Sequence, residues 1–181
     1  MKKNILPQLS LILLLFTGLA PAVVLGQDSK ELRMIADCNA AKAGFIKADK
    51  LMKNLFNNAA GYVIFPNVGK GAIGVGGAAG NGILFEKGKT AGKAKMTQVS
   101  VGFQFGGQAY REVIFFEDQA AINRFKEGKI EFAGQASAVA AKEGAAANVK
   151  YRDGVMVFSQ TKAGLMYEAS LGGQKFGYNA L

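Results

Sequence analysis

The chain has 181 residues, a formal net charge of +9 and one cysteine, and it contains neither histidine nor tryptophan. These absences exclude histidine-based catalytic triads, histidine-ligated zinc, histidine general bases and an internal disulfide. The excess of basic residues favours anionic partners such as lipid head groups, cell-wall polymers or nucleic acid.

Residues 1–26 have the layout of a secretory signal peptide. Lys2 and Lys3 precede an apolar run from Leu9 to Phe16 that is too short to span a bilayer, and small residues follow at signal-peptidase spacing. Loss of these two lysines, in a segment without acidic residues, would lower the charge from +9 to +7. We therefore expect one mature domain over 27–181, periplasmic or secreted, with a retained membrane anchor as the alternative.

Residues 28–59 have a helical composition, with no proline, a single glycine and many alanine, lysine and leucine residues. Asp28 and Ser29 are candidate N-caps, Gly44 is a candidate break between two helices, and Cys38 is expected to be buried. The second half of the segment is amphipathic. Its apolar face carries Phe45, Ala48, Met52, Leu55 and Phe56, and its basic face carries Lys47, Lys50 and Lys53.

Beyond residue 60, glycine becomes frequent and strand patterns replace the helical period. Continuous apolar strands are expected at 61–66 and 82–86. An alternating strand is expected at 96–107, with 108–118 as its antiparallel partner.

One further helix and a hairpin complete the predicted elements. Asp118 is expected to cap a short helix near 118–127, with Ile122 and Phe125 facing inward and Gly128 ending it. The last segment, 154–181, is expected to form a closing hairpin.

Paired glycines recur in "VGGAAG", "FGGQAY" and "LGGQKF". Such pairs within strands mark bends, bulges or close backbone approach. The predicted fold is therefore α+β, with the N-terminal helices packed on a strongly coiled, Gly-rich antiparallel sheet or a small β-barrel.

Gly69, Gly71 and Gly74 match the G-x-G-x-x-G fingerprint of dinucleotide-binding proteins. That motif requires a helix directly after the glycines, to receive the pyrophosphate. The following "VGGAAGNG" has too much glycine to form one, so the match indicates Gly-rich strands with tight turns, and no cofactor is expected.

Catalysis would have to rest on carboxylates, lysines or the lone thiol. Glu112 and Glu168 lie in apolar strands, where alternation places each on the solvated face; an inward carboxylate paired with a lysine is the alternative. No carboxylate pair or activated nucleophile has supporting context, so no catalytic residue, metal or enzyme activity is expected.

The lysines form two concentrations. Lys47, Lys50 and Lys53 form either a solvated helix face or the polar face of a membrane-surface helix. A second group lies near two turns and comprises Lys70, Lys87, Lys89, Lys93 and Lys95. Nucleic acid is not an expected partner, because no recognised nucleic-acid-binding signature accompanies the lysines.

Four stretches resemble the SYLF domain, a lipid-binding module: "GYVIFPNVGKGAIGVGGAAGNGILFE", "TQVSVGFQFGGQAYREVIFFEDQAAINRFKEG", "FAGQASAVAA" and "DGVMVFSQTKAGLMYEASLGGQKFGY". The resemblance covers residues from about 30 to the C-terminus. It implies phospholipid binding without catalysis, and by position the segment 45–56 corresponds to the amphipathic membrane-binding segment of relatives. With Lys70 added for its charge and turn location, the candidate lipid-binding residues are Lys47, Lys50, Lys53, Lys70, Phe45, Met52 and Phe56.

The sequence thus predicts a non-catalytic, peripherally membrane-associated protein of the bacterial envelope that binds anionic phospholipids. The alternatives are a small outer-membrane barrel, an enzyme acting on envelope polymers or lipids, and a scaffold that binds an envelope protein.

Overall fold

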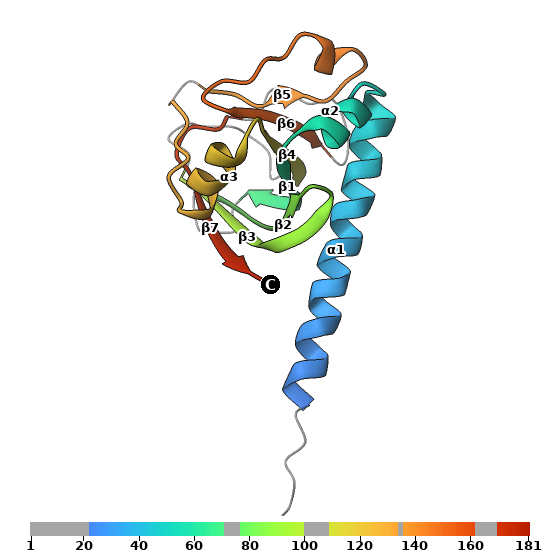
Figure 1. The fold of residues 1–181 in the computed structure, drawn as a ribbon, viewed down its shortest axis with the longest axis vertical. Helices are drawn as coiled ribbons and strands as arrows, with labels where there is room; N and C mark the ends of the chain where they lie inside the picture. The colour runs from blue at the N-terminus through green and yellow to red at the C-terminus, as the bar shows by residue number, and fades with distance from the viewer. Residues whose placement is uncertain (1–21, 71–76, 100–108, 134–135, 162–169) are drawn as a thin grey trace, which may run out of the picture.

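The computed structural model of the protein describes residues 22–70, 77–99, 109–133, 136–161 and 170–181. Two N-terminal helices, α1 (Ala22–Ala48) and α2 (Met52–Asn58), flank a seven-stranded sheet, as Figure 1 shows. The strands are β1 (Gly61–Lys70), β2 (Gly77–Glu86), β3 (Lys89–Val99), β4 (Tyr110–Phe116), β5 (Val139–Ala140), β6 (Val155–Thr161) and β7 (Gln174–Ala180). The remaining elements are α3 (Gln119–Lys126) and a 3-10 helix, η1 (Ala145–Ala147). The predicted α+β class is confirmed.

The sheet is open and mixed, with the strand order β5-β6-β4-β1-β2-β3-β7. Neighbouring strands are antiparallel except β5 and β6, which are parallel. Among the described strands, β5 and β7 are the two edges, so the predicted strong coiling and closure into a small barrel are wrong. The physical reason is that each face of the central strands is covered by its own layer of the fold. In a closed barrel, only the inner face of each strand would be buried.

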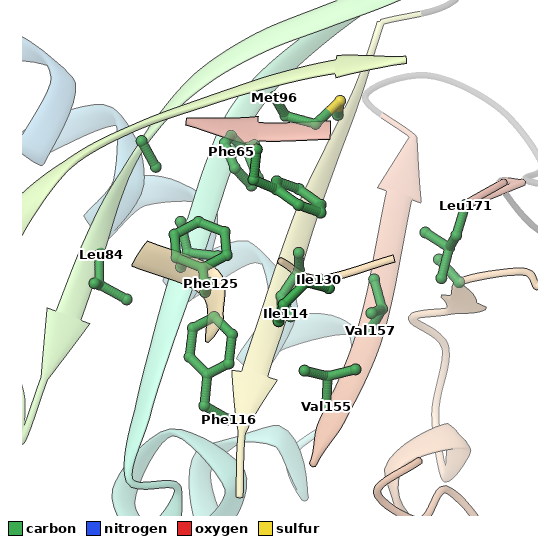
Figure 2. Packing of buried hydrophobic residues seen from close by; sticks show 14 of the residues in the cluster. Phe65, Leu84, Met96, Ile114, Phe116, Phe125, Ile130, Val155, Val157 and Leu171 are labelled. Atoms are coloured by element: carbon green, nitrogen blue, oxygen red, sulfur yellow. The ribbon is translucent and has the colours of Figure 1, made fainter. Parts of the chain in front are cut away.

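Strand β4 illustrates this two-sided burial. Val113 and Phe115 join the apolar cluster beneath α1 and α2, whereas Ile114 and Phe116 join the cluster beneath α3. Figure 2 shows the second cluster, in which the ring of Phe125 from α3 lies 5.2 Å from that of Phe116. Continuous apolar strands therefore mark the sheet centre, as such runs do in sheets that are covered on both sides.

One predicted strand pairing is wrong. Strand β4 pairs with β1 and β6 instead of β3, and β3 ends at Val99, so the rest of the predicted strand 96–107 lies outside the described residues. The closing hairpin was predicted to turn near 161–164, and residues 162–169 lie outside the described residues, so this pairing stays a prediction. Of the described strands in this segment, β6 pairs with β4 and β5, and β7 pairs with β3 at the far edge. Both faces of the apolar strands β4 and β6 must be buried. Their positions next to each other near the centre of the sheet provide this burial.

The N-terminal helices break at 49–51 and not at Gly44, and Asp28 and Ser29 lie inside α1 rather than capping it. Gly44 serves a different purpose: a Cβ at this position would collide with the guanidinium of Arg111. The glycine thus permits α1 to approach β4 closely. The buried position predicted for Cys38 is confirmed, with its Sγ 3.5 Å from the carbonyl oxygen of Ile64.

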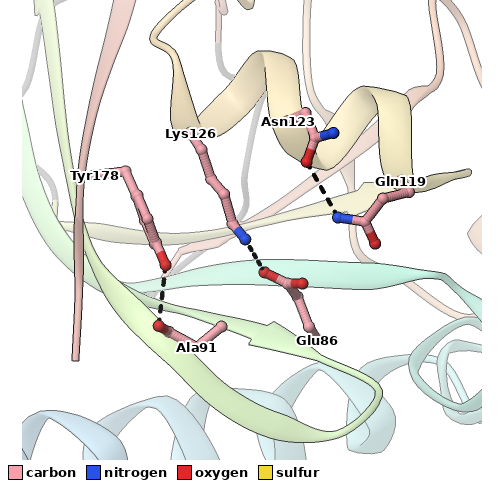
Figure 3. Close-up of polar contacts among 6 residues, drawn as sticks. All are labelled: Glu86, Ala91, Gln119, Asn123, Lys126 and Tyr178. Atoms are coloured by element: carbon pink, nitrogen blue, oxygen red, sulfur yellow. Dashed lines mark hydrogen bonds and ion pairs between the residues drawn. The ribbon is translucent and has the colours of Figure 1, made fainter.

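The prediction for α3 is confirmed. The Asp118 side chain accepts a hydrogen bond from the Ala121 N–H at 2.8 Å, Ile122 and Phe125 are buried, and Gly128 follows the helix with a φ of +68°. Figure 3 shows the polar contacts around this helix, where Lys126 forms an ion pair with Glu86 of β2.

The Gly-rich stretch around the apparent dinucleotide fingerprint belongs to the sheet. Gly69 lies in β1, the segment 71–76 lies outside the described residues, and Gly77 begins β2, which runs antiparallel to β1. The interpretation as Gly-rich strands is therefore confirmed for Gly69 and for the residues from Gly77 onward, whereas Gly71 and Gly74 lie outside the described residues. Gly173 adopts a φ of +76° in the turn before β7, so this glycine pair marks a turn and not a bend within a strand.

Helix α1 crosses several strands of the sheet. Its Glu31 forms a 2.7 Å ion pair with Lys93 of β3, Cys38 contacts Ile64 of β1, and Gly44 lies against β4. The helix thus divides its side of the sheet into two halves. The half nearer the start of β1 is covered by α2, whose residues Met52 and Phe56 are buried.

Candidate functional site

The corner between α1 and α2 brings together three of the predicted lipid-binding lysines. Lys47 is in the last turn of α1, Lys50 is in the connection, and Lys53 is in the first turn of α2; all three side chains are exposed. Lys70 is different, because only its backbone is described, paired with Ala78 of β2.

The predicted apolar residues of this segment point the other way. Phe45, Met52 and Phe56 belong to the cluster beneath α1 and α2, and Phe56, the most exposed of them, keeps 5 % exposure. The predicted division into an apolar and a basic face is therefore confirmed. In this structure, however, the apolar face contacts the sheet.

Asp49 fixes the geometry of the corner. Its side chain is 2 % exposed, its Oδ1 accepts a hydrogen bond from the Leu51 N–H at 3.0 Å, and its Oδ2 accepts one from the Ala146 N–H at 2.8 Å. The carboxylate thus satisfies donors at the helix connection and in η1 together, as buried polar groups require. Sequence reasoning missed this role because Ala146 is distant in the chain.

Leu51 lies at the apex of the corner and is 42 % exposed. A surface hollow of about 460 Å³ adjoins it. The hollow is lined by Lys47, Ala48, Asp49, Lys50, Leu51, Glu143 and Gly144. The exposed apolar side chain of Leu51 is flanked by three lysines. Such an arrangement can contact a layer whose outer groups are anionic and whose interior is apolar.

Lys42 contacts the aromatic residues on the buried side of the corner. Its Nζ donates a hydrogen bond to the Tyr62 hydroxyl at 2.9 Å and lies 4.8 Å from the ring centroid of Phe56 and 4.9 Å from that of Tyr62. Phe56 also makes an edge-on contact with Phe115 at 4.8 Å. These cation–π and aromatic contacts join α1, α2 and the sheet. They hold Phe56 in the core, so Phe56 could enter lipid only if α2 left the sheet.

Glu112 is buried, so its predicted place on the solvated face is wrong. Its Oε2 accepts a hydrogen bond from Gln174 Nε2 at 3.1 Å rather than from a lysine, and burial raises the pKa of the carboxyl to about 7. Glu112 Oε1 and the Oγ of Ser159, its neighbour across β4 and β6, have no hydrogen-bond partner among the described residues. Glu168 lies outside the described residues.

Three further properties of the described residues bear on function. They include no group of three or more acidic, cysteine or histidine side chains placed to hold a metal ion. None of their helices combines the length and hydropathy that a membrane crossing requires. Burial raises the pKa of the Cys38 thiol to about 12, so this thiol stays protonated at neutral pH.

Comparisons with known proteins identify relatives. Residues 97–179 match the model of the Ysc84 family, described as Las17-binding protein actin regulator. The chain is also 30% identical over 126 residues to Beta cell expansion factor A of Aeromonas veronii. That alignment covers 68% of this chain and 48% of the relative, so the chain spans about half the length of the curated protein it matches.

Proposed function

The chain belongs to the SYLF-domain (Ysc84) family, a family associated with lipid binding, and on this premise we propose that it binds anionic phospholipid surfaces through the corner between α1 and α2. The observation that carries the proposal is the placement of Lys47, Lys50 and Lys53 around the exposed Leu51. The protein is proposed to act in the periplasm or outside the cell, as the layout of residues 1–26 supports.

Two contributions to the binding free energy would hold the corner on an anionic phospholipid surface. Each lysine near an anionic surface contributes about 1 kcal/mol, and this contribution weakens as salt is added. Leu51 adds the burial of an apolar side chain between head groups. Phe45, Met52 and Phe56 act indirectly in this mechanism, because they anchor the corner to the sheet.

The proposed activity is non-catalytic. Glu112 is the described carboxylate with the raised pKa, but it is fully buried, so a substrate could not reach it without local opening. The names of the relatives refer to actin regulation and to beta-cell expansion, and the corner offers support for lipid contact rather than for either role.

Co-sedimentation with lipid vesicles tests the proposal. The protein should bind vesicles that contain phosphatidylglycerol and not vesicles of phosphatidylcholine alone. Substitution of Lys47, Lys50 and Lys53 by Gln should lower the partition coefficient on the order of 100-fold, from about 1 kcal/mol per lysine. Equal failure of the unmodified protein on both vesicle types would refute the proposal.

A further inference from the structure

The half of the sheet that α1 leaves uncovered is a polar, basic surface. Cross-strand register places Asn67 of β1 opposite Asn81 of β2, Asn81 opposite Lys95 of β3, and Lys95 opposite Gly177 of β7. Asn67, Asn81, Lys95 and Gly177 are all exposed. They form one continuous row across the sheet on the side of α1.

A second row runs parallel to the first. Ala79 lies opposite both Gly69 and Thr97, and Thr97 lies opposite Lys175, whose side chain is exposed. The two rows together are called the bare face. Among the described residues, its glycines Gly69 and Gly177 have open space beside them, because a Cβ added at either would meet no atom within 4 Å.

The reverse side of these strands is packed. Met96 of β3 and Phe176 of β7 belong to the core cluster beneath α3, and Val68 of β1 lies in the same cluster. The alternation of strand side chains therefore fixes the opposite residues in place on the bare face. In the part of the chain that the structure describes, the bare face thus has a packed layer behind it while its lysines and asparagines remain exposed.

The charge of the bare face is of one sign. Lys95 and Lys175 take part in no described ion pair, and the residues of the two rows include no carboxylate. The acid at its border, Glu31 of α1, is already paired with Lys93. Lys95 and Lys175 are diagonal neighbours on adjacent strands, a relation that separates such residues by about 7–8 Å, so both ammonium groups can reach one phosphate.

We propose that the bare face is a second contact for the phosphate groups of anionic phospholipids, with Lys95 and Lys175 as its cations and the Asn81 amide as a further donor. This inference rests on the proposed function and extends it from the corner to the sheet. The small residues of the two rows, Gly69, Ala79 and Gly177, leave room for a head group to approach the strands. The protein would thereby contact the membrane at two places. One is the corner at the C-terminal end of α1, and the other is the bare face of the sheet.

Vesicle binding of Lys95→Gln/Lys175→Gln tests the inference, with phosphatidylglycerol in phosphatidylcholine as the probe. Each lysine near the surface contributes about fivefold in affinity, so the double variant should bind at least about tenfold more weakly. The matched control is Lys87→Gln/Lys89→Gln, which removes the same charge at the β2–β3 turn and should stay within about twofold of the unmodified protein. Lys95→Arg/Lys175→Arg should retain binding, which separates charge from folding defects.

The outcomes are distinguishable. If the unmodified protein binds but both glutamine pairs lose affinity equally, only net charge matters and the bare face is not a contact. If the bare-face pair binds like the unmodified protein, the inference is refuted while the corner proposal stands. Absence of binding by the unmodified protein would refute both. Soluble glycerol phosphate, at the same phosphate concentration as the vesicles, should not displace the protein from them. Such displacement would contradict docking on a membrane surface.

Discussion

Asp49 joins two segments that are 97 residues apart in the chain, because its Oδ2 accepts a hydrogen bond from the Ala146 N–H at 2.8 Å. Together with the bond from the Leu51 N–H, this contact determines the shape of the proposed lipid-binding corner.

Substitution Asp49→Ala should destabilise the protein by about 1–3 kcal/mol, because donors in a partly buried environment lose their acceptor. Asp49→Asn, which keeps one side-chain carbonyl oxygen, should lose less. The exposed Asp37→Ala is the control and should change the free energy of unfolding by less than about 0.5 kcal/mol. Urea denaturation measures all three, and a neutral Asp49→Ala would contradict the structural role of this carboxylate.

Stability should depend on pH through Glu112. Its pKa is about 7 in the folded protein against an ordinary value of 4.5, so between these pH values the folded state holds a proton that the unfolded state has released. The free energy of unfolding should therefore fall as the pH rises from about 4.5 to about 7 and be insensitive to this group outside that window.

Glu112→Gln replaces the ionisable carboxyl group by a neutral amide and so tests whether Glu112 causes the pH dependence. The variant should lose the decline of stability across the window and be more stable than the unmodified protein at pH 8. The exposed Glu131→Gln should keep the decline. Parallel profiles for the unmodified protein and Glu112→Gln would show that another group carries the pH dependence.

Lys42 and Tyr62 should be energetically coupled. Lys42→Met keeps most of the aliphatic stem but removes the ammonium group from the Tyr62 hydroxyl and from the two rings. We expect a loss of about 1–2 kcal/mol from the hydrogen bond and the cation–π contacts. A double-mutant cycle with Tyr62→Phe should give a coupling energy of at least about 0.5 kcal/mol, and additive effects would mean that the contact contributes nothing.

Local sequence signals predicted the helices and several strand positions. Asp118 and Gly128 delimit α3 through neighbours a few residues away, and the continuous apolar runs at 61–66 and 82–86 predicted β1 and β2, which are buried on both faces. The same two-sided burial explains why alternation misplaced Glu112. When both faces of a strand are covered, the period of two cannot tell which face meets solvent.

The strand order and the role of Gly44 depended on distant partners. Pairing β4 with β1 and β6 joins segments that no local turn connects. Gly44 was predicted to break the helix, but it accommodates Arg111 of β4, a contact set by the tertiary fold. The basic face of the corner was predictable from helical spacing, whereas Asp49 and Lys42 became visible only through their contacts.

The absence of tryptophan from the chain gives the most direct test of the corner, because Leu51→Trp introduces a single fluorescent reporter at its apex. With vesicles that contain phosphatidylglycerol, its emission should shift to shorter wavelength and become quenchable by brominated lipid. Ala120→Trp, at an exposed position on α3 on the opposite side of the sheet, is the control and should not respond. Vesicle binding without a response at position 51, or with a response only at position 120, would contradict the proposal that the corner meets the membrane.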